Sequence, residues 1–65
     1  MEIIVNSKSL TLSGSTVADL VGQLGLPSDG VAVAVGTDIV PRGEWGSHAL
    51  EEGANVMIIK AASGG

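Results

Sequence analysis

A single stretch of the sequence carries the periodicity of an amphipathic helix, and this stretch limits the folds open to the chain. Its apolar residues recur at i, i+3, i+4 and i+7, the spacing that places side chains on one helix face. They are Val17, Leu20, Val21 and Leu24. Thr16 and Asp19 fit the capping box of a helix start, and Gly25 fits its C-terminal cap. Gly22 inside the run is unfavourable, which predicts a close packing contact there. One helix over residues 17–24 therefore needs a sheet to cover.

The remaining apolar segments have the composition of strands. β-Branched residues dominate them, and turn-forming residues separate them. The expected strands are Glu2–Asn6, Leu10–Leu12, Val31–Val35, Ile39–Val40 and Asn55–Lys60. The first two form a hairpin, and the chain from Arg42 to Ala54 is irregular. Asn55–Lys60 is nearly continuously apolar, which is typical of a strand buried on both faces and predicts a central position in the sheet.

The order of these elements predicts an α+β fold. A mixed sheet of four to five strands with one main helix packed across it buries every apolar face economically. The last strand would lie in the middle, parallel to the first, which is the ubiquitin-like β-grasp arrangement. A chain of 65 residues is long enough for one domain only. We expect a single domain over residues 1–60 and a flexible tail over residues 61–65.

Composition excludes several classes of function. Seven acidic residues against three basic ones give a net charge of −4, and Trp45 is the only aromatic residue. Nucleic-acid binding needs cations and stacking side chains, so we expect no nucleic-acid partner.

The start of the chain is too short and too acidic for a signal peptide, and no apolar run could span a membrane. The expected location is the cytoplasm, and an acidic surface favours a basic protein partner.

Side chains offer no catalytic or metal site. The chain has no cysteine, and His48 is its sole histidine. Glu51 and Glu52 lie near it, but a zinc site needs more nitrogen or sulfur ligands than this, so a solvated histidine beside surface glutamates is the better interpretation. We therefore predict no bound cofactor, no metal and no enzyme activity of its own.

The end of the chain carries the chemistry instead. Gly64 and Gly65 have no Cβ, so they form a thin thread that can enter a narrow active site, with Ser63 just before them. The α-carboxylate of a peptide ordinarily has a pKa of about 3.5, so it is ionised at neutral pH. Such a carboxylate can attack the α-phosphate of ATP, and a sulfur nucleophile can then displace AMP. An inert, frayed terminus is the alternative interpretation.

The whole chain resembles the bacterial sulfur carriers of thiamine biosynthesis, which are small β-grasp proteins related to ubiquitin. The resemblance is carried by Ile3–Asn6, Thr16–Leu20 and Val31–Val35, and most specifically by Ile39–Trp45 with its Pro-Arg-x-x-Trp pattern and the terminal diglycine. The family commonly has Asn and Asp where this chain has Gly36 and Ala54.

The resemblance implies a cycle in which the chain is a co-substrate. An E1-like enzyme uses ATP to adenylate Gly65, a persulfide donor converts it to a thiocarboxylate, and thiazole synthase takes the sulfur. The alternatives are a carrier of another pathway, such as the small subunit of molybdopterin synthase, a protein modifier of the ubiquitin kind, and a non-carrier interaction module.

A docking surface should accompany the tail. A sheet covered by a helix on one side leaves its other face free, and we expect exposed apolar residues there, next to the tail. The expected partner contacts are Arg42, Trp45, Met57 and Ile59. Trp45 has a second interpretation, as a cap over the edge of an aromatic-poor core, and we favour that one.

Overall fold

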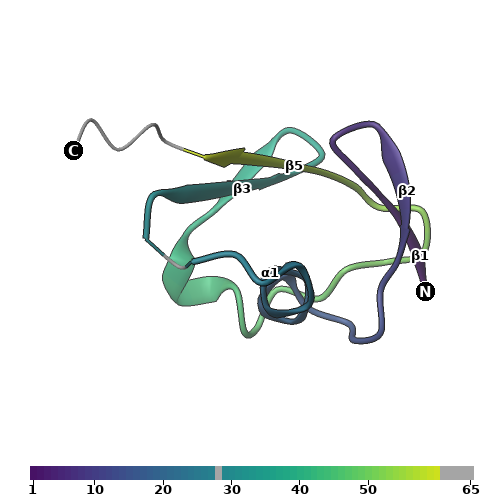
Figure 1. Ribbon diagram of the computed structural model, residues 1–65, viewed down its shortest axis with the longest axis horizontal. Helices are drawn as coiled ribbons and strands as arrows, with labels where there is room; N and C mark the ends of the chain where they lie inside the picture. Colours follow the sequence, from purple (N-terminus) through teal and green to yellow (C-terminus); the bar gives the residue numbers. More distant parts are fainter. Residues whose placement is uncertain (28, 61–65) are drawn as a thin grey trace.

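In the described residues, 1–27 and 29–60, the chain forms one mixed sheet with a single α-helix packed across one face (Figure 1). The structure is a computed structural model. The strands are β1 (Glu2–Val5), β2 (Lys8–Thr11), β3 (Val31–Val35), β4 (Asp38–Val40) and β5 (Asn55–Lys60). Helix α1 spans Val17–Leu24, and a 3₁₀ turn, Arg42–Glu44, follows β4. No helix in this part of the chain is long and apolar enough to cross a membrane.

The strand order β2-β1-β5-β3-β4 confirms the predicted topology. β5 lies in the middle and runs parallel to β1 and antiparallel to β3. The predicted burial of β5 on both faces is wrong, however. Val56 and Ile58 are buried under the helix, whereas Met57 and Ile59 are exposed on the opposite face. The reason is that α1 covers only one side of the sheet, so the apolar run has one face in the core and one in solvent.

The core lies between α1 and the inner face of the sheet. Its buried members are Ile3, Leu12, Val17, Leu20, Val21, Val33, Val40, Trp45, Leu50, Val56 and Ile58. The predicted apolar face of the helix is confirmed for its first three residues. Leu24 departs from it, because 39% of this side chain is exposed. The helix ends there, and the sheet beneath it continues.

Main-chain bonds from the irregular segment after β4 fix the start of α1. The N–H groups in the first turn of a helix have no partner within the helix. Here Val17 N–H donates to the His48 carbonyl at 3.1 Å, and Ala18 N–H donates to the Trp45 carbonyl at 3.0 Å. The Thr16 hydroxyl accepts from Asp19 N–H at 3.2 Å. The loop therefore orients the helix although it contains little regular structure.

The predicted capping box is present at Thr16 and Asp19. The Asp19 carboxylate accepts N–H bonds from Ser15 at 2.9 Å and Thr16 at 3.1 Å. Gly14 leaves room for this arrangement, because a Cβ there would collide with the Asp19 side chain. The bonds from Ser15 and then from Thr16 hold the pKa of Asp19 below its usual value of 3.8.

This lowered pKa predicts an acid-dependent loss of stability. Because Asp19 has a lower pKa in the folded chain than in the unfolded chain, its contribution is present above the unfolded pKa. It is lost as the pH falls through the folded pKa. We expect Asp19→Asn to unfold more easily than the unaltered chain at neutral pH, with the difference shrinking below pH 3.8. Urea unfolding over this pH range measures it, and a constant difference would contradict the assignment.

Gly22 does not have the close packing contact that the sequence predicted. A Cβ built at this position meets no heavy atom within 4 Å. Glycine inside a helix is less favourable than alanine because of its backbone entropy. We therefore expect Gly22→Ala to raise the free energy of unfolding by about 0.5–1 kcal/mol. Thermal or urea denaturation tests this, and a lowered stability would reveal an unseen contact.

Candidate functional site

The three residues predicted to thread a partner's active site, Ser63, Gly64 and Gly65, lie outside the described residues. The structure does place the strand that leads to them. β5 is the central strand and ends at Lys60, which pairs with Val31 at the start of β3. Residues 61–65 therefore follow in sequence directly after the central strand, which pairs with both β1 and β3. A partner that holds the sheet also fixes where the tail begins.

Exposed apolar side chains gather on the face of the sheet opposite the helix. Ile39 is 63% exposed, Met57 54%, Ile59 48% and Ile4 38%. We call these four residues the outer patch. Exposed apolar side chains gathered on one face are typical of interaction surfaces. The predicted exposure of apolar residues next to the tail is thus confirmed, and the contact role of Met57 and Ile59 stays a prediction.

Strand pairing brings the outer patch together. Ala34 of β3 pairs with Met57 on one side and with Ile39 on the other, and Ala32 pairs with Ile59. Directly paired residues on one face have their Cβ atoms about 4.5–5.5 Å apart. The two alanines are short, so the larger side chains of β4 and β5 stand on either side of them. Ile39, Met57 and Ile59 are therefore joined over neighbouring strands, and Ile4 lies next to them on β1, where it pairs with Asn55 of β5.

Sequence reasoning missed Ile4 and Ile39 as members of this surface. The signal that could have found them is strand parity. Ile4 alternates with the buried Ile3, and Ile39 alternates with the buried Val40. Once Ile3 and Val40 are assigned to the core, their neighbours must point to the opposite face.

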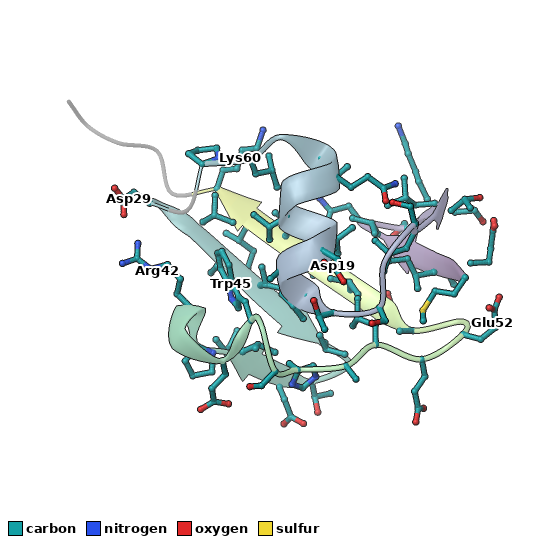
Figure 2. The ribbon with its side chains drawn as sticks, turned by 90° about the horizontal axis from the view of Figure 1, so that it is seen from below. Asp19, Asp29, Arg42, Trp45, Glu52 and Lys60 are labelled. Atoms are coloured by element: carbon teal, nitrogen blue, oxygen red, sulfur yellow. The ribbon has the colours of Figure 1, made fainter. Side chains whose placement is uncertain are left out.

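Arg42 lies on the exposed 3₁₀ turn, and its Nη1 donates to Asp29 Oδ1 at 2.6 Å. Figure 2 shows the two side chains facing each other. Asp29 precedes β3 by two residues, so the pair lies near the end of the sheet where β5 finishes. Both side chains are largely exposed, and exposed ion pairs contribute only about 0–1 kcal/mol.

Trp45 is a core residue, in agreement with the favoured interpretation. Only 5% of it is exposed, and its Nε1 donates to the Val40 carbonyl at 3.0 Å. The hydrogen bond satisfies the indole N–H, so the ring fills space in a core that has no other aromatic residue. In this position the indole offers a partner almost no surface.

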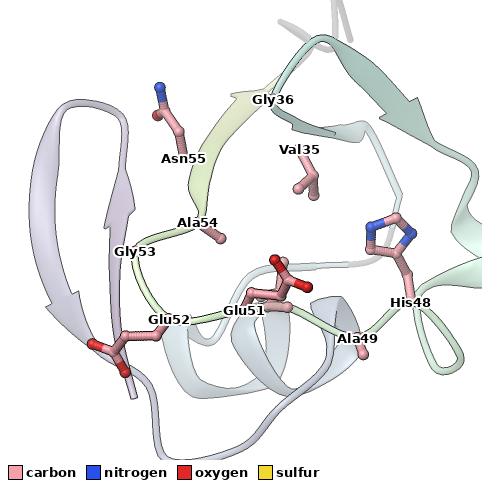
Figure 3. A pocket seen from close by; sticks show the side chains of 10 residues that line it. Val35, Gly36, His48, Ala49, Glu51, Glu52, Gly53, Ala54 and Asn55 are labelled. Atoms are coloured by element: carbon pink, nitrogen blue, oxygen red, sulfur yellow. The ribbon is translucent and has the colours of Figure 1, made fainter.

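A pocket of about 400 Å³ lies at the opposite end of the sheet from Lys60, where β3 ends and β5 begins (Figure 3). His48 and Glu51 turn toward it, whereas Glu52 points away. His48 is half-buried rather than fully solvated as the sequence suggested. Within the described ranges, no group of three or more histidine, cysteine, aspartate or glutamate side chains could hold a metal ion.

Known structures share this architecture. A crystal structure of a thiamine biosynthesis protein (ThiS) from Geobacter metallireducens matches it with a TM-score of 0.81 at 23% identity, covering 100% of both chains. A solution structure of a thiamine biosynthesis protein from the same organism gives a TM-score of 0.79 at 23% identity, covering 100% of this chain and 88% of that one. At such identity the likeness establishes the fold. The molecule is a small β-grasp protein with an apolar outer sheet face.

The chain belongs to the ThiS family, whose sequence profile matches residues 1–65. It is 32% identical over 66 aligned positions to the sulfur carrier protein ThiS of Escherichia coli K12, with all of both chains covered. It is also 33% identical over 66 positions to a thiazole synthase of Paramagnetospirillum magneticum. In that protein the match accounts for 20% of the length.

The resemblance implies asparagine and aspartate at the positions of Gly36 and Ala54, and the geometry of the turn bears on the first of them. Gly36 has a φ of +64° in the turn between β3 and β4. Asparagine and glycine are the residues that adopt this left-handed conformation most readily. The turn geometry is therefore compatible with either residue. Nothing in the structure explains Ala54.

Proposed function

We propose that this protein carries sulfur for the formation of the thiazole ring of thiamine, with the α-carboxylate of Gly65 as its only reacting group. The observation that carries the proposal is membership of the ThiS family over residues 1–65, including the terminal diglycine. The relative from E. coli is named a sulfur carrier, and the relative from P. magneticum is named a thiazole synthase. Both names support a role in this one pathway.

The chemistry divides between this chain and its partners. An E1-like enzyme would bind ATP, and the Gly65 carboxylate oxygen would attack the α-phosphorus, with pyrophosphate leaving. The resulting mixed anhydride is a reactive acyl donor. The terminal sulfur of a persulfide donor would then attack the carbonyl carbon, with AMP leaving. Cleavage of the S–S bond by a thiol would leave a thiocarboxylate, which thiazole synthase would consume.

The outer patch would hold the carrier while the tail reacts. It lies on β4, β5 and β1, and β5 leads into the tail, so a partner bound there would fix the point from which the tail starts, at Lys60. Arg42, on the exposed turn at the same end of the sheet, would contact an acidic group of the partner. The proposal gives no contact role to Trp45, because its side chain is buried.

Loading can be observed directly. The chain is incubated with ATP, the activating enzyme and a persulfide donor, and its intact mass is then measured. We expect a gain that corresponds to the replacement of one oxygen atom by sulfur. An unchanged mass under conditions where the authentic carrier of that enzyme is loaded would overturn the proposal.

The outer patch gives a separate prediction about docking. Met57→Asp places a charge at the centre of the patch, and we expect the KM of the activating enzyme for the carrier to rise about tenfold or more. Because Met57 is exposed, stability should change by no more than about 0.5 kcal/mol. Ala49→Asp is the matched control, since Ala49 is also exposed but lies outside the patch. Equal KM values for the two variants would remove the patch from the docking surface.

A further inference from the structure

β5 extends beyond the strand that pairs with it on the β1 side. β1 and β5 pair only through Ile4 with Asn55 and Val5 with Val56. The chain then turns away at Asn6 and Ser7, whose φ values of 49° and 71° lie in the left-handed region. Two successive positive φ values are those of the tight turn that joins strands of a hairpin. The last part of β5 therefore has β3 on one side and no strand on the other among the described residues.

The Asn6 side chain takes the place of the missing strand for one residue. Its Nδ2 donates to the Ile58 carbonyl at 3.2 Å, and its Oδ1 accepts from Ile58 N–H at 2.8 Å. Backbone groups alternate in direction along a strand, so the N–H and carbonyl of Lys60 point to this same side. There the structure shows them no partner in residues 1–27 and 29–60. These two groups of Lys60 form an open sheet edge one residue long, at the end of the central strand.

A groove of about 440 Å³ adjoins this open edge on the helix side. It exists because α1 ends at Leu24 while the sheet continues, and Figure 2 shows Lys60 toward that end of the helix, with Asp19 at the other. Its walls are more apolar than polar, and its lining includes no acidic residue. The lining residues are Val5, Asn6, Lys8, Leu24, Leu26, Ile58 and Lys60.

The charge of the groove is opposite to that of the molecule. Lys8 and Lys60 are two of the three basic residues of a chain with a net charge of −4. A segment that carries carboxylates would be attracted to this place and repelled from most of the remaining surface. The open edge adds a second preference, because an extended segment can bond with its own backbone to both the N–H and the carbonyl of Lys60.

We propose that the groove and the open edge of β5 together form a second docking surface, which takes an extended, acidic segment of a partner protein. The segment would add to the sheet beside Lys60, in the manner of strand addition. Its apolar side chains would enter the groove against Leu24 and Ile58, and its carboxylates would pair with Lys8 and Lys60. This surface lies on the helix side of the sheet, opposite the outer patch, and does not depend on the sulfur chemistry.

The first experiment titrates the full chain with short peptides and follows its backbone amide shifts. One peptide has a central run of valines flanked on both sides by glutamates, and the matched peptide has lysines in place of the glutamates. We expect the acidic peptide to shift the amides of Lys8, Ile58 and Lys60 and to bind about tenfold more tightly than the basic one. Equal affinities, absent binding, or largest shifts on the outer patch would each overturn the proposal.

The role of the backbone is tested with an acidic peptide whose valine nitrogens are methylated. Methylation removes the donors needed for strand addition and keeps the charge, so we expect binding to be lost. Undiminished binding would show that charge alone attracts the peptide and would overturn strand addition. Shifts of the same amides on diluting the chain alone would identify a second copy as the occupant, which also contradicts the proposal.

The role of the lysines is tested with matched variants. Lys8→Gln with Lys60→Gln should weaken binding of the acidic peptide about tenfold at low salt. Ser15→Glu with Ser47→Glu lowers the net charge equally at two exposed positions that do not line the groove. Retained affinity in this control and loss in the lysine variant support the proposal. The same loss in both variants would mean that only net charge matters.

Discussion

Deletion of Gly65 is expected to abolish sulfur loading and to leave the fold unchanged. The deletion moves the carboxylate back by up to about 3.6 Å along an extended chain. An attacking oxygen misplaced by as little as about 1 Å can cost about a hundredfold in rate, so the loss of reach is sufficient. The core is formed by residues between Ile3 and Ile58, and Gly65 lies well beyond it in sequence. The melting temperature should therefore stay the same.

Two readouts separate the steps that the deletion would block. ATP–pyrophosphate exchange with the activating enzyme reports adenylation, and intact mass reports the thiocarboxylate. His48→Ala serves as the control, because His48 lines the pocket of about 400 Å³ described above and has no part in the proposed chemistry. We expect it to load normally. Normal loading of the Gly65 deletion would instead refute the assignment of the reacting group.

Gly64→Val tests the width of the path to the active site without shifting the terminus. A branched Cβ needs space that a thread of glycines does not, and it also restricts the backbone. If the partner encloses the tail narrowly, adenylation should fall as it does for the deletion. If Gly64→Val is adenylated at the normal rate while the Gly65 deletion is not, the length of the tail matters and its narrow width does not.

The elements of the fold could be predicted because their patterns are local. The period of Val17, Leu20 and Val21 located α1 at its observed bounds, and the β-branched run Val31–Val35 located β3. The central position of β5 was inferred from its nearly continuous apolar run, and that position is correct although the run is buried on one face only. What could not be predicted is the role of the segment after β4. The Trp45 and His48 carbonyls of this segment accept hydrogen bonds from the first N–H groups of the helix, which lie far away in the sequence.

The candidate site was predicted only in part, for a physical reason. A continuous apolar run such as Val56–Ile59 arises both in a strand buried on two faces and in a strand with one face in the core and one for docking. The sequence pattern is the same in the two cases, and only the short length of α1 and its position on one face distinguish them. The groove near Lys60 depends on the place where the helix stops relative to the sheet, which no local pattern records.

Leu20→Ala is expected to be the most destabilising single truncation in α1. Leu20 is fully buried, and removing its side chain leaves a cavity between the helix and the inner face of the sheet. Such changes cost about 2–5 kcal/mol, with the larger values where the surroundings cannot collapse. A domain of this size has a thin core and a small total stability, so a loss in this range would unfold much of the population.

Leu24→Ala provides the matched control on the same helix. The chemical change is identical, but 39% of Leu24 is exposed, so the truncation removes fewer packed contacts and leaves no closed cavity. We expect it to cost about 1 kcal/mol, as surface and half-buried truncations commonly do. Urea denaturation of the two variants gives the comparison. A loss below about 1 kcal/mol for Leu20→Ala, or a larger loss for Leu24→Ala, would mean that the helix face is assigned wrongly.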